Sequence, residues 1–388
     1  MTAQPTRILQ IVPRLFPDVD GVGDYALQLA HQLHDHSQIL SDFLVFRPNP
    51  QLQPMLDQFA VHRLNHHTAQ GLVDQVPENI STIFLQYSNY PYLLGKLDTP
   101  MWLVDALKSL KQRGLRIVVM FHELPTLRYK QIRCPNVVQR RVSRGLAQVA
   151  DVVVTNNAAF QQTLAGWTES PVHCVPNFST IGEVGQVPTL SERKRSLIVF
   201  GSSDRTRVYR HNTRTINRVC QLLKIDTLYD VGRPIEWDSQ GLDVKVVKTG
   251  FLSASEISQL MAESLAGIFD YRRFPQNLAK STVYAAYCSH GLLPICNGHG
   301  LRTQDGIVAN HHYVVTSSLH QFAQPSSLQA IADNAQAHYQ TRTLAQCTAQ
   351  FSQLIYPVAS APALNTDVYT EIGIGHRLRT PHPPTPSP

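Results

Sequence analysis

Short apolar runs rich in β-branched residues alternate with helical patterns along almost the whole chain. The runs of the first half are Ile8–Val12, Ile80–Tyr87, Ile117–Phe121 and Val152–Thr155. Those of the second half are Leu197–Gly201, Thr227–Val231, Val244–Val247, Leu265–Phe269, Leu292–Cys296 and Tyr313–Thr316. Continuous apolar strands separated by helices are typical of parallel sheets that helices cover on both faces. The sequence therefore predicts an α/β protein with two doubly wound, Rossmann-like sheets.

The segment 179–194 separates the two series of strands and is rich in Gly, Pro, Ser and charged residues. Because 388 residues suffice for two cores, we place a hinge in this segment. We predict a first domain over 1–180, a second over 195–345, and a closing helix with a tail over 346–375. The last residues, 380–388, offer no apolar anchor, and we expect them to be disordered.

The composition indicates where the protein is located and whether it binds a metal or another cofactor. The sequence has no stretch of 18 apolar residues and no apolar signal region, which predicts a cytoplasmic protein without a membrane span. Its six cysteines form no Cys-x-x-Cys pair, and no histidines and acids are spaced as metal ligands are. We therefore expect neither a metal nor another cofactor.

Positive charge is concentrated in one part of a chain whose formal net charge is +6. Lys108–Arg144 contains ten Lys or Arg residues and one acid. This segment is either an ordinary solvated face or a patch that holds the protein peripherally at the inner face of a phosphate-rich membrane. We expect no nucleic-acid partner.

The first candidate ligand loop is Asp18–Tyr25, which contains Gly21 and Gly23. It joins the first strand to its helix, where glycines allow close ligand approach and helix N–H groups are unpaired. The two glycines lack the spacing of a dinucleotide fingerprint. The loop is therefore either a tight turn or part of a ligand site in which Gly23 contacts the ligand.

The second candidate is His122, which is followed by Glu123 at the end of an apolar strand. Functional groups gather at the carboxyl ends of strands in open α/β sheets. A histidine at neutral pH can donate a hydrogen bond to a sugar hydroxyl or carbonyl, and Glu123 would orient the ring. The alternative is a histidine that bonds only to local backbone.

The third candidate begins at Gly201, which ends the first strand of the second domain and precedes Arg205, Arg207 and Arg210. Guanidinium groups bind phosphate oxygens in a two-pronged manner. Arginines here would suit a diphosphate and stabilise it as a leaving group. A solvated charged loop is the alternative.

The fourth candidate contains Asn277, Lys280, Ser281 and Thr282, which precede a helix of small residues over 283–290. Backbone N–H groups, hydroxyls and a lysine at a helix N-terminus can form a cradle for a diphosphate. Simple capping of the helix by a hydroxyl is the alternative.

In their order, these motifs resemble the family 4 retaining glycosyltransferases, which have the GT-B fold. The resemblance covers residues 7–356 and rests on Gly-Val-Gly-Asp-Tyr-Ala at 21–26, Phe-His-Glu at 121–123, Ala-Asp-Val-Val-Val-Thr-Asn at 150–156, Val-Phe-Gly-Ser-Ser at 199–203, Gly-Phe-Leu-Ser-Ala-Ser-Glu at 250–256, Lys-Ser-Thr at 280–282 and His-Gly-Leu-Leu-Pro-Ile at 290–295. It implies a first domain that receives the acceptor, a second that holds the nucleotide sugar, and a metal-independent reaction that retains the anomeric configuration.

The resemblance also implies roles for residues. It places His122 near the transferred sugar, and both Arg205–Arg210 and Asn277–Thr282 at the donor diphosphate. One departure concerns the ribose, which many members hold with the second of two glutamates eight positions apart. This chain has no glutamate between Glu263 and Glu371, so either other groups hold the ribose or donor binding is lost.

We therefore predict a hexosyltransferase-type enzyme of polysaccharide biosynthesis that uses a UDP- or GDP-sugar and a sugar, glycan or lipid-linked acceptor. The candidate catalytic residues are His122, Glu123, Arg207 and Arg210. The candidate donor-binding residues are Gly23, Gly201, Arg205, Asn277, Leu278, Lys280, Ser281, Thr282 and Tyr284. The alternatives are an inactive GT-B-shaped binding or assembly protein and another GT-B enzyme such as a sugar-nucleotide epimerase.

Overall fold

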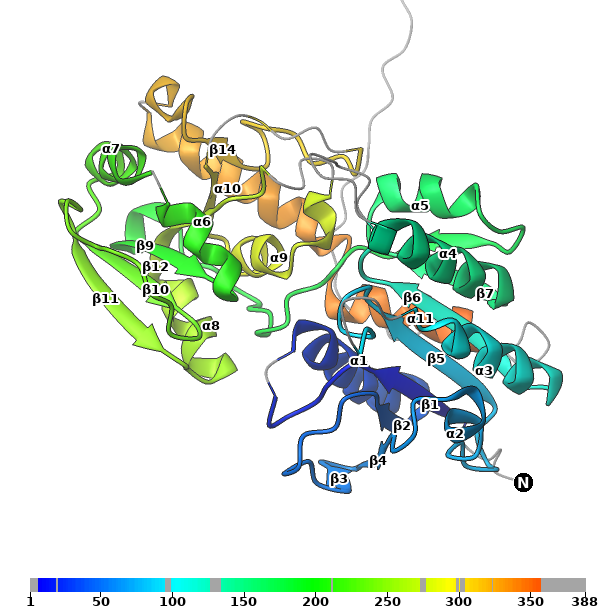
Figure 1. Ribbon diagram of the computed structural model, residues 1–388. Helices are drawn as coiled ribbons and strands as arrows, with labels where there is room; N and C mark the ends of the chain where they lie inside the picture. The colour runs from blue at the N-terminus through cyan, green and yellow to red at the C-terminus, as the bar shows by residue number, and fades with distance from the viewer. Residues whose placement is uncertain are drawn as a thin grey trace, which may run out of the picture. The chain divides into compact units, whose positions relative to one another are not determined.

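The computed structural model describes residues 6–18, 20–94, 99–125, 134–210, 212–272, 277–297, 300, 304–322 and 324–356, without the side chains of 134–136 and 203. The described residues up to 355 lie in one compact unit that holds both sheets (Figure 1). The predicted tail after residue 356 and the predicted disorder of 380–388 lie outside the described residues. No helix in the described ranges is both long and apolar enough to cross a membrane.

The first sheet has the strand order β3-β4-β2-β1-β5-β6-β7-β8. Its strands are β1 (Arg7–Val12), β2 (Leu40–Val45), β3 (Met55–Leu56), β4 (Phe59–Arg63), β5 (Thr82–Tyr87), β6 (Arg116–Phe121), β7 (Val152–Thr155) and β8 (Val172–Cys174). Its helices are α1 (Gly21–Ser37), α2 (Ala69–Val73), α3 (Met101–Gln112), α4 (Cys134–Val149) and α5 (Ala158–Ala165). All neighbouring strands pair in parallel except β3 with β4.

The second sheet has the strand order β11-β10-β9-β12-β13-β14 and is parallel throughout. Its strands are β9 (Lys194–Phe200), β10 (Thr227–Val231), β11 (Lys245–Gly250), β12 (Ser264–Phe269), β13 (Leu293–Cys296) and β14 (Val314–Val315). Its helices are α6 (Thr206–Tyr209), α7 (Thr213–Leu223), α8 (Ala254–Glu263), α9 (Thr282–Ser289) and α10 (Pro325–Gln340), and the closing helix α11 (Leu344–Ile355) follows. All ten predicted strands are confirmed.

The closing helix α11 packs on the first sheet rather than on the second. Side chains alternate between the two faces of a strand, so Ile83 and Leu85 of β5 join the core under α3 and α4. Phe84 points to the opposite face, where its ring lies 5.5 Å from that of Phe351 of α11. The same helix contacts α1 (Figure 1), and the guanidinium of Arg116 donates to its carbonyl at Leu354.

Each sheet has a topological switch point near its middle. In the first sheet the chain runs from β1 outward through β2 and then returns to the other side of β1 as β5. In the second sheet it runs from β9 outward through β10 and returns as β12. Loops diverge where the strand order reverses, and open α/β sheets bind ligands in the crevice that this leaves at the carboxyl ends of the strands. The fold therefore predicts ligand sites after β1 and β5 and after β9 and β12.

Candidate functional site

A cavity of about 380 Å³ lies where these two switch points meet. The first sheet contributes residues that follow β1, β5 and β6, and the second contributes residues that follow β9 and β12 together with the start of α9. Cavities of this size are typical of small-molecule sites. The cavity is therefore the candidate active site, and its lining decides which of the predicted residues can touch a ligand.

The loop after β1 brings Asp20 and Gly21 to the cavity but not Gly23. The carboxylate of Asp20 caps α1 by accepting hydrogen bonds from the backbone N–H groups of Val22 and Gly23, both at 3.0 Å. A Cβ atom on Gly23 would lie 2.2 Å from the carbonyl oxygen of Arg14. The assignment of Gly23 to ligand contact is therefore wrong, because this glycine allows the helix to approach backbone rather than ligand.

His122 lines the cavity and is 6% exposed. Its Nε2 is hydrogen-bonded to Oε1 of Gln86 at 2.8 Å, and its ring stands edge-on to Tyr25 with 5.0 Å between ring centroids. Burial, reinforced by the nearby charge of Lys280, lowers the pKa of His122 to about 3. The imidazole is therefore neutral at pH 7. Gln86, rather than the expected Glu123, holds the ring.

Glu123 pairs instead with Lys280, and this ion pair joins the residue group that follows β6 of the first sheet to the segment that precedes α9 beside the second sheet. Nζ of Lys280 lies 3.0 Å from Oε1 of Glu123. The lysine side chain is 8% exposed and the glutamate side chain 39% exposed, and Ser88 donates to the other glutamate oxygen at 3.4 Å. Asn177 adds a second link by donating to the carbonyl oxygen of Lys280 at 2.7 Å. Both charged groups line the cavity.

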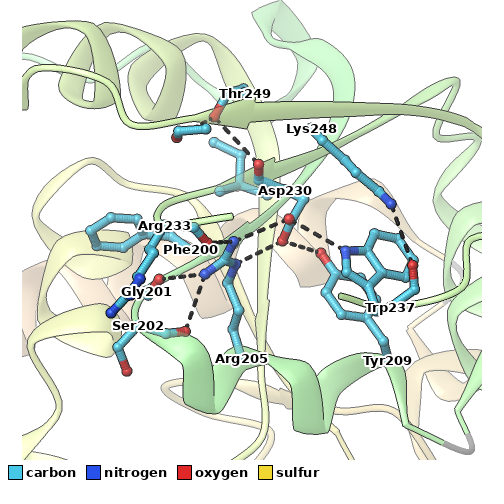
Figure 2. Close-up of polar contacts among 12 residues, drawn as sticks. Phe200, Gly201, Ser202, Arg205, Tyr209, Asp230, Arg233, Trp237, Lys248 and Thr249 are labelled. Atoms are coloured by element: carbon cyan, nitrogen blue, oxygen red, sulfur yellow. Dashed lines mark hydrogen bonds and ion pairs between the residues drawn. The ribbon is translucent and has the colours of Figure 1, made fainter. Parts of the chain in front are cut away.

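Arg205 also borders the cavity, but its guanidinium has no donor left for a phosphate. Nε and Nη2 donate to the two carboxylate oxygens of Asp230 at 2.8 and 3.1 Å. The remaining three N–H groups donate to the carbonyl oxygens of Gly201, Ser202 and Arg233 (Figure 2). A guanidinium has five N–H donors, and all five are used. The assignment of Arg205 to diphosphate binding is therefore wrong.

The polar cluster around Asp230 holds the loop after β9 in place (Figure 2). The hydroxyl of Tyr209 donates to Asp230 at 2.7 Å, and the indole N–H of Trp237 approaches the same carboxylate at 3.4 Å. The two rings stack with 3.6 Å between centroids, and the ammonium of Lys248 lies 4.7 Å above the indole. Gly201 keeps its predicted place in the cavity wall with a φ of +132°, which side chains rarely tolerate.

The two arginines predicted as catalytic differ in position. Arg207 lines the cavity, is 29% exposed and pairs with Asp204 at 2.8 Å. Arg210 ends α6 as an exposed residue and is not part of the cavity wall. The backbone leaves the helix at Arg210, with φ −59° and ψ 114°, so the structure does not bring this arginine to the cavity together with Arg207, and nothing in the site supports its predicted catalytic role.

In the segment before α9, too, some of the predicted residues line the cavity and others do not. Lys280, Ser281 and Thr282 line the cavity, and Val283 lines it as well. Oγ of Ser281 accepts from the backbone N–H of Tyr284 at 3.1 Å and so caps α9. The amides of Thr282 and Val283 precede the first intrahelical bonds, and within the described residues they have no protein acceptor. The capping interpretation is therefore confirmed, and the diphosphate cradle, which the cap does not exclude, stays a prediction.

Three residues of this segment that were predicted to bind the donor do not line the cavity. Leu278 is fully buried in the core of the second domain. Tyr284 is buried too, and its hydroxyl donates to the carbonyl oxygen of His312 at 3.2 Å. Asn277 precedes the short 3₁₀ helix η3 (Leu278–Lys280) and is absent from the cavity wall.

Several further residues that the sequence motifs did not indicate also lie at the site. Ser88 follows β5, Tyr271 follows β12, and Asn177 precedes the second domain, and all three line the cavity. The first two are polar residues just after apolar strands, which is a signal that a wider strand-end search would have found. Gln86 carried a different signal, since a buried amide inside an apolar strand needs a partner.

The charges of the cavity wall balance closely. Its acids are Asp20, Glu123, Asp204 and Asp270, and its bases are Arg205, Arg207 and Lys280. Each base has a carboxylate partner. Among the described residues, no three His, Cys, Asp or Glu side chains gather as metal ligands do. An anionic ligand that pairs with Arg207 or Lys280 must therefore displace the carboxylate that already holds that base.

The two sheets define a class of protein: the fold is GT-B, and the candidate ligand cavity lies between the two sheets. No protein-family model matches the chain, and no curated protein sequence does. Solved structures match over most of its length.

Among these structures is WaaG, a glycosyltransferase involved in lipopolysaccharide biosynthesis, at 13% identity and a TM-score of 0.57, covering 90% of this chain and 99% of WaaG. Another is a point mutant of S. aureus TarM in complex with Fondaparinux, alpha-GlcNAc-glycerol and UDP. It is 7% identical to this chain with a TM-score of 0.59, and the match covers 91% of this chain and 100% of the TarM chain. A UDP-N-acetylglucosamine 2-epimerase is 11% identical with a TM-score of 0.52, and the match covers 89% of this chain and 94% of the epimerase. At these low sequence identities, the structural likeness shows the fold of the chain and nothing more specific.

Proposed function

We propose that the chain is a glycosyltransferase that moves a sugar from a UDP- or GDP-sugar to a sugar, glycan or lipid-linked acceptor, with retention and without a metal ion. The observation that carries the proposal is the cavity at the two switch points, where a neutral histidine faces basic groups and the start of a helix. The shared fold of WaaG and of TarM, the latter in complex with UDP, supports a nucleotide sugar as donor.

The diphosphate would lie at Arg207, Lys280 and the amides of Thr282 and Val283. These groups line one cavity, and helix N-termini and cations both attract phosphate. When the bond between the sugar and the phosphate oxygen breaks, its electron pair stays on that oxygen. Fixed positive charge next to the oxygen stabilises the leaving group, so the proposed reaction needs no metal.

Binding would require Lys280 to exchange partners. Its ammonium is paired with Glu123 at 3.0 Å and is almost buried. A diphosphate carries more negative charge than one carboxylate and would draw the ammonium toward itself. Glu123 would then be released next to His122 and Ser88, where it could bond hydroxyl groups of the sugar.

The alternative function is a binding or assembly protein without transferase activity. Two observations favour it: each base of the cavity already has a carboxylate partner, and no glutamate occurs between Glu263 and Glu371. Calorimetry with UDP and GDP separates the two proposals, because an enzyme must bind one of them. An epimerase would be recognised by an altered nucleotide sugar formed without any acceptor.

The decisive experiment compares Arg207→Ala with Arg210→Ala. The two arginines are three positions apart, but only Arg207 lines the cavity. Loss of a charged hydrogen bond of ~1.5–3 kcal/mol predicts about tenfold to hundredfold weaker nucleotide binding for Arg207→Ala. Arg210→Ala should bind as the wild type does, and equal affinity in both variants would contradict the proposal.

Turnover assays test the finer parts of the proposal. Release of UDP or GDP should be unchanged by EDTA if Arg207 and Lys280 stabilise the leaving group alone. Proton NMR of the product should show the anomeric configuration of the donor. An EDTA-sensitive reaction would contradict metal independence, and an inverted product would contradict retention.

A groove between α3 and α4 supports an anionic or lipid-linked acceptor. Lys108, Lys111, Arg141 and Arg144 line it, and its volume is about 580 Å³. Lys111 pairs with Asp151 at 2.8 Å, whereas Arg141 and Arg144 have no acidic partner within the described residues. The double variant Arg141→Ala, Arg144→Ala should lose co-sedimentation with anionic vesicles at low salt. Equal sedimentation with neutral and anionic vesicles would contradict a charge-driven contact.

A further inference from the structure

A line of buried polar side chains crosses the middle of the first sheet. It runs from Ser41 on β2 through Gln10 on β1 and Gln86 on β5 to His122 after β6. The four residues are 2%, 0%, 0% and 6% exposed. Polar groups enclosed this completely need partners, and here each one bonds the next.

The amide groups give this line a direction. Nε2 of Gln10 donates to the hydroxyl oxygen of Ser41 at 3.1 Å, and Nε2 of Gln86 donates to Oε1 of Gln10 at 2.9 Å. The carbonyl oxygen of Gln86 is therefore the atom that meets Nε2 of His122 at 2.8 Å. A carbonyl oxygen only accepts, so the hydrogen lies on Nε2. A neutral imidazole has one N–H group, which leaves Nδ1 with a lone pair.

We propose that Gln86, held by Gln10, is a positioning residue that fixes the Nε2–H tautomer of His122, so that Nδ1 offers the cavity a hydrogen-bond acceptor that selects a substrate hydroxyl. The proposal deepens the proposed function and rests on it for the identity of the substrate. It reverses the role that the sequence suggested for His122, which was donation to a sugar oxygen.

Burial and electrostatics maintain this state of the ring. The imidazole lies between the ring of Tyr25 and the cavity, and Lys280 brings a positive charge toward it from the second domain. Both effects disfavour protonation and lower the pKa of His122 to about 3. A second hydrogen would turn Nδ1 into a donor, so the acceptor persists across the neutral range.

An acceptor nitrogen discriminates between the two kinds of oxygen in a nucleotide sugar. A hydroxyl can donate to Nδ1, whereas an ionised phosphate has only lone pairs and would be repelled. Within the described residues Nδ1 has no protein partner, so a sugar that lacks the hydroxyl leaves it unpaired. Such a deoxy donor should be used about tenfold to a hundredfold less efficiently.

Nitrogen NMR of the full-length chain with ¹⁵N-labelled histidine tests the tautomer directly. The protein has 17 histidines, and the signals of His122 are those that disappear in His122→Gln. We expect a protonated Nε2 and an unprotonated Nδ1 at pH 7 that persist down to about pH 4, since the pKa of His122 is about 3. A protonated Nδ1 at pH 7, or a titration near pH 6.5, would overturn the proposal.

Two substitutions separate positioning from mere packing. Gln86→Met removes the acceptor, so His122 should become a mixture of tautomers. Gln86→Glu keeps an acceptor, so Nε2–H should be retained while the added negative charge raises the pKa of His122. Gln259→Met, on the exposed side chain that bonds Glu263, is the matched control and should leave the signals unchanged. A single Nε2–H tautomer in folded Gln86→Met would overturn the proposal.

The two proposals fail in distinguishable ways. If Gln86→Met does not fold, Gln10→Met still tests the support of Gln86 and should broaden the tautomer distribution of His122. The NMR experiment needs no substrate, so absent UDP and GDP binding would contradict only the proposed function. A protonated Nδ1 together with normal nucleotide binding would contradict only the role of Gln86.

Discussion

Arg205 and Asp230 form a buried ion pair beneath the loop that follows β9. Two nitrogens of the guanidinium donate to the two carboxylate oxygens at 2.8 and 3.1 Å, and the two side chains are 2% and 4% exposed (Figure 2). Since the other guanidinium N–H groups donate to backbone carbonyls, this arginine shapes the cavity wall without offering it a donor. Its substitution should therefore act through stability.

Arg205→Met should destabilise the second domain strongly. Removing one partner of a buried pair leaves Asp230 charged and unpaired, which typically costs ~3–5 kcal/mol. Urea unfolding measures this loss, and Arg210→Ala, at an exposed position of the same segment, should change stability by less than ~0.5 kcal/mol. A stable Arg205→Met protein whose only defect is weak nucleotide binding would contradict the structural role.

Glu123→Gln should lower the melting temperature of the ligand-free protein and enlarge the increase in melting temperature that UDP or GDP causes. The substitution leaves the almost buried ammonium of Lys280 without its carboxylate, so the melting temperature should fall by an amount that corresponds to about 1 kcal/mol or more. An anionic ligand would restore the lost charge partner. The increase in melting temperature on adding UDP or GDP should therefore exceed that of wild type, whereas in Lys280→Met it should nearly vanish. Equal ligand responses in all three proteins would exclude the proposed partner exchange.

Among the described strands, the sequence patterns missed β2, β3, β4 and β8. Strands β3 and β8 have only two and three residues, and charged side chains interrupt or end β2 and β4. Strand β2 contains Asp42, which is 4% exposed and would not be expected inside a strand. Its partner is Arg7, whose guanidinium donates to the carboxylate at 2.9 Å. The two residues are 35 positions apart. A local pattern cannot show such a pair, because the charge that makes Asp42 tolerable lies in another strand.

The residues of the cavity could be predicted only in part, for the same physical reason. The rule that ligands bind at the carboxyl ends of strands pointed to His122 and Gly201, and the rule for helix N-termini pointed to Lys280; all three line the cavity. It did not separate Arg205 from Arg207, because the carboxylate that engages Arg205 follows 25 positions later on β10. Tyr284 looked available but belongs to the buried face of α9, and that face is set only when the helix packs on its sheet.

His122 should make stability depend on pH in the acidic range. Its pKa is lowered from 6.5 to about 3 in the folded state, so between these values the unfolded chain binds a proton that the folded chain does not. The contribution of neutral His122 to the free energy of unfolding is therefore complete above pH 6.5. As the pH falls below that value, the contribution is lost by up to ~1.4 kcal/mol per pH unit. Denaturation of wild type and His122→Asn between pH 7 and pH 4 should give a shallower slope for the variant. His36→Asn, on an exposed histidine, should keep the wild-type slope; identical slopes in all three would contradict the burial of a neutral ring.

Phe351 should anchor the closing helix to the first domain. Its ring is fully buried and lies 5.5 Å from that of Phe84, on the face of the sheet opposite α3 and α4. Phe351→Ala removes this contact and leaves a cavity, which typically costs ~3–5 kcal/mol. Leu222→Ala, at a side chain that is 44% exposed, should cost far less because little apolar contact is lost. If α11 stabilises the first domain, hydrogen exchange in Phe351→Ala should accelerate in β5 and α1, which contact α11, and not in β10. Faster exchange confined to the second domain would contradict this prediction, because it would show that α11 stabilises the second domain, which it follows in the sequence.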